Sequence, residues 1–175
     1  MCSTLIMNKR STYIGLIAGI VMIALSIFFF YGLKLPVKGN NQFVIIAVFL
    51  AAILLTMFAY KRTNPLQAGI KNYFAEGFKT FVVATLLMAV YTFIFYKLNP
   101  QILEAAIIEN EVLAAKEGNH TAIEITNNSA KLRNIFMPMM MAITTLKFLI
   151  LGAVASVVAA AFISPKNNNA VNVKP

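Results

Sequence analysis

Four long apolar runs, each bounded by lysine or arginine, dominate the hydropathy pattern of this 175-residue chain. A helix that rises about 1.5 Å per residue needs about 20 apolar residues to cross a hydrocarbon core roughly 30 Å thick. The third run is the shortest, and it suffices if Lys79 and Lys97 extend their side chains toward the lipid headgroups. The pattern therefore predicts membrane-spanning helices at about residues 12–33, 42–60, 79–97 and 139–164.

The segment before the third predicted span alternates apolar and polar residues with the period of a helix. Its apolar positions are Ile70, Tyr73, Phe74, Gly77, Phe78 and Phe81, and its polar positions are Lys71, Asn72, Glu76 and Lys79. This spacing predicts an amphipathic helix that lies in the membrane interface and runs into the third span. Such a helix could bind anionic lipid or a partner, or it could only orient the span. The pattern favours a helix that only orients the third span.

The connection at residues 98–134 carries its own helix signals and five of the six glutamates. Asn99 followed by Pro100 is typical of a helix start, and Gly118 is typical of a helix end. Thr121 and Glu124 match a capping box, which starts a second helix. We expect an extracytoplasmic helical hairpin whose glutamates lie on a solvated face, since their spacing defines no metal site.

These patterns together predict an all-α protein. Four transmembrane helices form a bundle, with the interfacial helix before the third and the helical hairpin between the third and the fourth. Residues 1–165 are expected to form a single membrane domain, and the asparagine-rich residues 166–175 a disordered tail.

The composition agrees with a bilayer environment and excludes several kinds of chemistry. Hydrophobic residues make up 59% of the chain and charged residues 12%, whereas soluble domains are about 45–50% apolar and about 25% charged. The chain has no aspartate or tryptophan, one histidine and one cysteine. It therefore lacks the residues for a Walker B motif, an ordinary EF-hand, a zinc cluster or an intrachain disulfide. We expect no cofactor, no metal and no enzymatic activity.

The positive charge is distributed in a way that predicts orientation. An even number of spans puts both termini on one side, which carries eight lysines and arginines against six on the other, with Lys147 inside a span. The positive-inside rule then predicts that both termini are cytoplasmic in a bacterial inner membrane. Cations at helix ends facing anionic leaflets account for the net charge of +9. We therefore expect no nucleic-acid partner.

Two features inside the predicted spans are candidate functional residues. Small residues at four-residue spacing let helices approach closely, which favours bundle packing or, alternatively, an oligomer interface. These helix-packing candidates are Gly15, Gly19, Gly152, Ser156 and Ala160. The second feature is Lys147, the ionisable residue that interrupts the last apolar run. Its side chain could reach the interface, which we favour, or it could line a pathway for an ion.

The order of these features resembles a bacterial domain-of-unknown-function family of small four-helix inner-membrane proteins. The resemblance covers roughly Tyr13 to Ile163 and rests on the first span with its two glycines, the segment from Gly69 to Lys79, the Leu98-Asn-Pro100 exit and a glycine-containing last span. It implies a membrane location and this topology, and it carries over no active site. Many members of the family have an acidic residue early in the last span, where this chain has Lys147. That departure argues against a shared ion-handling role.

Our leading functional hypothesis is a non-enzymatic structural or partner-binding component of the membrane. The bilayer is its expected environment, and its expected partners are further copies of the chain or another membrane or envelope protein. The alternative is a small transporter or channel subunit with Lys147 near the pathway. The first three spans are unbroken and nearly free of polar groups, which favours the first hypothesis.

Overall fold

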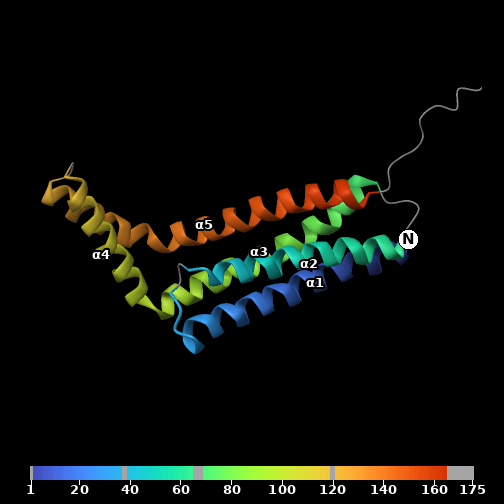
Figure 1. Ribbon diagram of the computed structural model, residues 1–175, viewed down its shortest axis with the longest axis horizontal. Helices are drawn as coiled ribbons and strands as arrows, with labels where there is room; N and C mark the ends of the chain where they lie inside the picture. The colour runs from blue at the N-terminus through green and yellow to red at the C-terminus, as the bar shows by residue number, and fades with distance from the viewer. Residues whose placement is uncertain (1, 37–38, 65–68, 119–120, 165–175) are drawn as a thin grey trace, which may run out of the picture. The chain divides into compact units, whose positions relative to one another are not determined.

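The computed structural model describes residues 2–36, 39–64, 69–118 and 121–164, and the side chains from Arg10 onward within these ranges. Every regular element in the described ranges is helical, which confirms the all-α prediction (Figure 1). The elements are α1 (Cys2–Ile27), a short π-helix η1 (Phe28–Gly32), α2 (Asn41–Thr63), α3 (Ile70–Leu98), α4 (Pro100–Glu117) and α5 (Ala122–Ile163). The predicted tail at residues 166–175 lies outside the described residues.

Four of these helices are long and apolar enough to cross a membrane, as predicted. They are Arg10–Gly32, Asn41–Thr63, Ile70–Leu98 and Ala122–Ile163. The chain is thus a four-span, multi-pass type of protein by the length and composition of its helices.

The first candidate span, Arg10–Gly32, agrees with the predicted residues 12–33. One boundary differs from those that the hydropathy pattern suggested. The second helix of the predicted hairpin and the fourth span form one continuous 42-residue helix, α5, and Pro138 lies inside it. A helix of this length extends about 63 Å, about twice the thickness of a hydrocarbon core. α5 is therefore longer than a single membrane crossing requires.

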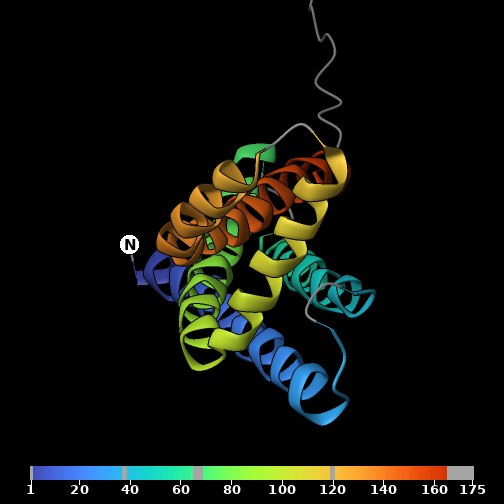
Figure 2. The same cartoon turned by 90° about the vertical axis from the view of Figure 1, so that its left-hand side faces the viewer.

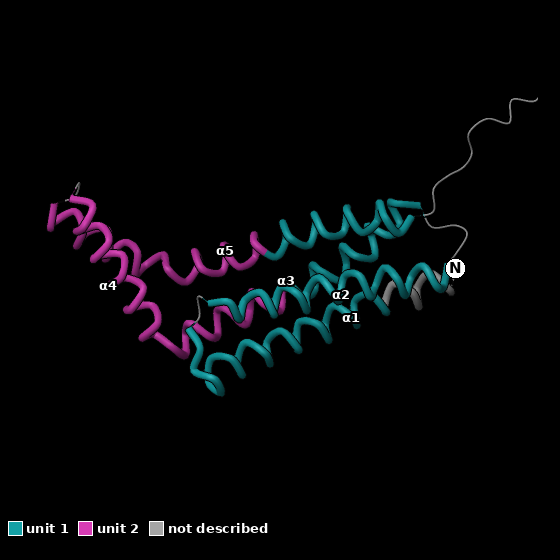
Figure 3. Tube along the Cα trace, viewed as in Figure 1, with its two compact units in different colours: residues 1–85, 148–175 teal, residues 86–147 magenta. Residues whose placement is uncertain are grey.

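The chain divides into two compact units, and both α3 and α5 contribute to each of them (Figure 3). Unit 1 contains residues 1–85 and 148–175, and unit 2 contains residues 86–147. In unit 1 the helix α1 packs against α2 (Figure 2). Side-chain contacts join α1 and α2 to the first part of α3, and α2 to the last part of α5.

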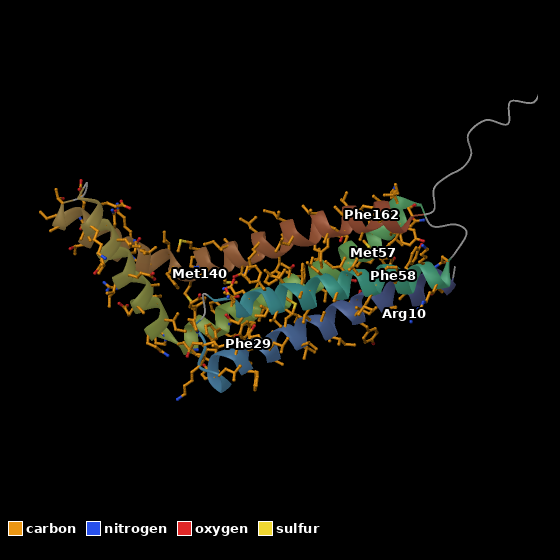
Figure 4. All side chains as sticks on the ribbon, in the orientation of Figure 1. Arg10, Phe29, Met57, Phe58, Met140 and Phe162 are labelled. Carbon is orange, nitrogen blue, oxygen red and sulfur yellow. The ribbon has the colours of Figure 1, made fainter. Side chains whose placement is uncertain are left out.

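The core of unit 1 is made of apolar side chains from all four of its helical segments. Phe49 of α2 packs edge-on against Phe148 of α5, with ring centroids 5.0 Å apart. Met57 is fully buried, whereas Phe162 is 85% exposed (Figure 4). Large exposed apolar residues of this kind suit a surface that faces lipid, since lipid tails are as apolar as a protein core.

Unit 2 consists of the end of α3, the whole of α4 and the first part of α5. Ile107 is the buried residue of α4, and Glu104 of α4 forms a two-pronged ion pair with Arg133 of α5. The capping box is confirmed: the Thr121 backbone N–H donates to Glu124 Oε2 at 2.8 Å, and the Glu124 N–H donates to Thr121 Oγ1 at 3.3 Å. The sequence signals therefore located the start of α5 correctly.

The start and end of α4 also follow the sequence signals. Pro100 occupies its first turn, where a missing backbone N–H does no harm. Gly118 ends it in the left-handed conformation, with φ of 67°. Asn99 takes the N-cap position, but its side-chain amide donates to the Phe95 carbonyl at 2.9 Å.

Candidate functional site

A layer of polar side chains lies inside the otherwise apolar helical bundle of unit 1. All of its members are less than 9% exposed, and each of the four helical segments of unit 1 contributes at least one of them. The polar layer consists of Ser11, Thr56, Glu76, Thr80 and Ser156. Polar groups are costly in a membrane-spanning bundle unless they find partners, which makes such a layer a candidate site.

Thr80 of α3 contacts both α1 and α2 through its side-chain hydroxyl. Its Oγ1 lies 3.1 Å from the Glu76 carbonyl oxygen, 3.2 Å from the Ser11 carbonyl oxygen and 2.9 Å from Thr56 Oγ1. The Thr56 hydroxyl donates its own proton to the Ala52 carbonyl at 2.9 Å, so Thr56 Oγ1 can accept a proton from Thr80. One hydroxyl of α3 thereby contacts acceptors on α1, α2 and its own helix.

Glu76 brings a carboxylate into this layer, and both of its oxygens are engaged. The Ser11 hydroxyl donates to Oε2, and the Lys79 ammonium lies 2.8 Å from Oε1. The Glu76 side chain is 10% exposed and the Lys79 side chain 34% exposed, so the charge pair lies at the edge of the bundle interior. A buried carboxylate without a partner would be strongly destabilising, and Lys79 supplies that partner from the next turn of the same helix.

Glycines allow the helices to approach closely around the layer. A Cβ atom on Gly15 would lie 2.6 Å from the Thr80 carbonyl oxygen, and one on Gly152 would lie 2.5 Å from Cγ of Phe81. At Gly77 an added Cβ would meet Met57 Cε at 2.5 Å and Ser156 Oγ at 2.8 Å. Helices in lipid associate through close packing of this kind. The polar contacts of Thr80 therefore depend on the small residues beside it.

Two fully buried hydroxyl groups in or beside the layer have no hydrogen-bond partner within the described part of the chain. They are Ser156 Oγ and Tyr73 OH, and the latter residue packs edge-on against Tyr60 with ring centroids 5.5 Å apart. Native structures leave few such groups unsatisfied. These two hydroxyl groups are therefore still able to form hydrogen bonds.

The helix-packing candidates from the sequence are all buried in unit 1. Gly15 and Gly152 lie against α3, as described above. Gly19 is buried, Ala160 is fully buried, and Ser156 belongs to the polar layer. This chain's own helices cover the five residues, so their burial is explained without an oligomer. Whether the chain self-associates through them stays a prediction.

Lys147 is not a member of this layer. It belongs to the stretch of α5 in unit 2, and its side chain is half-buried. The two interpretations of Lys147, as an interfacial residue or as part of a pathway, both remain predictions.

The prediction that Glu76 lies on the exposed, polar side of an interfacial helix is wrong. The hydropathy pattern placed Glu76 on the polar side of an interfacial helix and left every span without an acid, yet Glu76 is 8% exposed inside α3. Ile70 and Phe78, from the predicted apolar side, are 55% and 47% exposed. Lipid-facing and core-facing residues are both apolar in a membrane helix, so apolar periodicity does not mark the inward side. The spacing of the polar residues from Glu76 to Thr80 was the signal that could have marked it.

The chemistry available to the polar layer is that of one neutralised carboxylate and several hydroxyls. Within the described residues, no group of three or more His, Cys, Asp or Glu side chains could hold a metal ion. The contacts of Glu76 and Thr80 join α1, α2 and α3, so the layer serves to hold these helices in register.

These features define a helical protein with four membrane-span-like helices, of which the first three are joined through a buried polar layer. An additional helix, α4, lies between the third and the fourth along the chain. Residues 13–164 match the family described as "Protein of unknown function (DUF4199)", so the chain belongs to that family. This membership confirms the resemblance drawn from the sequence to a family of unknown function. No curated protein and no solved structure matches the chain.

Proposed function

We propose that the protein is a non-enzymatic membrane component that binds another membrane or envelope protein through α4. The observation that carries this proposal is an exposed apolar face on that helix. Ile108 and Val112 are 56% and 47% exposed, whereas Ile107 is fully buried. α4 is not among the four helices long and apolar enough to span a membrane, and we propose that a protein rather than lipid covers this face.

The chemistry of this face indicates the kind of partner. Ile108 and Val112 are four residues apart and therefore lie on one side of the helix. Glu109 and Glu111 lie beside them in the sequence. A face with apolar anchors and nearby carboxylates complements an apolar patch bordered by lysine or arginine.

Photo-crosslinking in native membranes tests the proposal. A benzophenone amino acid in place of Val112 is expected to give one discrete protein adduct. The same group in place of Asn110, which is exposed but lies about half a turn away from Ile108 and Val112, serves as the matched control and is expected to give little of that adduct.

The effect of substitutions on the adduct shows whether a protein partner or lipid occupies the apolar face of α4. Ile108→Glu should abolish it, because a carboxylate in a desolvated apolar contact is costly, and Asn110→Glu should leave it intact. Adducts with lipid alone, or a protein adduct that survives Ile108→Glu, would contradict the proposal.

A second candidate function is that of a transporter or channel subunit, and two observations favour it. α3 carries a buried carboxylate at Glu76, and α5 carries the half-buried Lys147. Charged groups in membrane-spanning helices commonly mark ion pathways. Ion flux in reconstituted vesicles that falls in both Glu76→Gln and Lys147→Leu would support this function. Wild-type vesicles no leakier than protein-free vesicles under every ion gradient tried would exclude it.

A further inference from the structure

Four exposed cations lie at one end of unit 1, where the apolar part of α1 begins, α2 ends and α3 begins. This basic end consists of Arg10, Lys61, Arg62 and Lys71. Within the described residues, none of the four takes part in an ion pair or a side-chain hydrogen bond. The Arg10 side chain points outward from the start of the first span (Figure 4).

The polar layer shows that these cations come from helices that are held together at this level. Arg10 precedes Ser11, which contacts both Glu76 and Thr80 of α3. Thr56, which contacts Thr80, lies five residues before Lys61. At about 1.5 Å per residue, these separations place the cations within about 10 Å of the layer along the helix axes.

The charge of the basic end is not balanced by acids on the same unit. Glu76 is the acidic residue that the described part of unit 1 contains, and it is buried and paired with Lys79. It has no free carboxylate oxygen to offer to the exposed cations. The surface at this end is therefore strongly positive.

Apolar and aromatic side chains adjoin these cations. Tyr13 is 64% exposed one turn after Arg10, and Ile70, beside Lys71, is 55% exposed. A free phosphate would use the cations alone. A ligand with an anionic head and hydrocarbon chains would use both kinds of surface, and tyrosine is the residue type favoured at the depth of lipid headgroups.

We propose that the basic end binds the phosphate headgroup of an anionic phospholipid, whose acyl chains lie along the exposed apolar residues of α1 and α3. Each lysine or arginine near an anionic headgroup strengthens such binding about fivefold at moderate salt, and the effect falls as salt is added. This proposal uses no residue of α4, so it stands independently of the proposed partner binding.

Lipid selectivity of the full-length protein in phosphatidylcholine membranes tests this site. Spin-labelled phosphatidylglycerol and spin-labelled phosphatidylcholine are compared for the fraction immobilised by the protein. The wild type is expected to prefer phosphatidylglycerol by more than about fivefold at low salt and by much less in 1 M salt, where the screening length is about 3 Å.

A variant without the four charges of the basic end and a matched control show whether the lipid preference comes from this end. Combining Arg10→Gln, Lys61→Gln, Arg62→Gln and Lys71→Gln should bring the preference close to one. Combining Lys116→Gln with Lys131→Gln, which neutralises exposed cations of unit 2, should leave it unchanged. Circular dichroism and the thermal midpoint confirm that each variant is folded, and single Gln variants replace the quadruple one if it is not.

Three outcomes would overturn the proposal. The first is a wild-type preference near one. The second is a preference that the folded basic-end variants retain in full. The third is displacement of the labelled lipid by soluble glycerol phosphate at equal concentration, since that would show that the acyl chains contribute nothing and that a free phosphate is the ligand.

Discussion

Replacing Gly15 by alanine is the substitution whose effect the structure defines most sharply. The added methyl group would lie 2.6 Å from the Thr80 carbonyl oxygen, 3.1 Å from its Cα and 3.2 Å from its carbonyl carbon. All three atoms belong to the backbone of α3, so no side-chain rotation can relieve the contact. α1 and α3 must move apart, which lengthens the distance between Thr80 Oγ1 and the Ser11 carbonyl oxygen, now 3.2 Å.

The expected magnitude follows from two opposing terms. Overpacking of a well-packed interior costs about 1–3 kcal/mol, and a rigid backbone obstacle puts Gly15→Ala at the upper end. Replacing a mid-helix glycine by alanine gains about 1 kcal/mol in helix propensity. Gly15→Ala should therefore lower the free energy of unfolding by about 2 kcal/mol.

Gly77→Ala is the matched control because Gly77 is also a buried helical glycine beside the polar layer. Its methyl group would meet Met57 Cε and Ser156 Oγ, which are ends of side chains that can rotate, and Ser156 Cβ at 3.3 Å, which needs a shift of only a few tenths of an ångström. Here the gain in helix propensity should offset the strain, leaving stability within about 1 kcal/mol of the wild type.

The assay is equilibrium unfolding in mixed micelles, in which a denaturing detergent is titrated and helicity is followed by circular dichroism. Equal stability of Gly15→Ala and the wild type would refute the close contact between α1 and α3. If Gly77→Ala loses more unfolding free energy than Gly15→Ala, a backbone contact is not more destabilising than a side-chain contact, and the reasoning is refuted.

Three further substitutions are expected to have distinct effects, the first two measured in the same unfolding assay and the third by amide exchange. Lys79→Ala should destabilise by about 3 kcal/mol by leaving a buried carboxylate unpaired, and adding Glu76→Gln should recover most of that loss; additivity of the two changes would contradict the pairing. Arg133→Ala removes an ion pair whose partners are both 48% exposed, so the loss should stay below about 1 kcal/mol. Thr121→Ala should cost about 1 kcal/mol at the start of α5, seen as faster amide exchange around Glu124; unchanged exchange would contradict the capping role.

The sequence predicted two kinds of feature. The spans depend on the surrounding solvent, and the helix ends depend on side chains that act on the neighbouring backbone. Lysine and arginine at the ends of apolar runs identified four spans because charged groups avoid hydrocarbon. The capping box at Thr121 and the glycine at 118 identified helix ends because these side chains act on their own backbone neighbours. Both kinds of signal lie within a few residues of the feature they predict.

The polar layer was missed because it depends on contacts between distant residues. Ser11 and Glu76 are 65 positions apart, and Thr56 and Thr80 are 24 positions apart. No single helix shows that its polar residue meets another one. The continuity of α5 through Pro138 was missed for a related reason, since a change from polar to apolar composition marks where a helix enters the membrane without ending it.

The central prediction, drawn from the sequence, is that a four-span topology with cytoplasmic termini puts Thr63 and Lys116 on opposite sides of the membrane. Cysteine labelling tests it most directly. Thr63→Cys, at the end of α2, and Lys116→Cys, in α4, are each introduced into a Cys2→Ser background and treated with a membrane-impermeant maleimide in right-side-out vesicles. We predict that the cysteine at 116 is labelled at once and that the cysteine at 63 is labelled only after permeabilisation. Equal labelling of both positions before permeabilisation would contradict the claim.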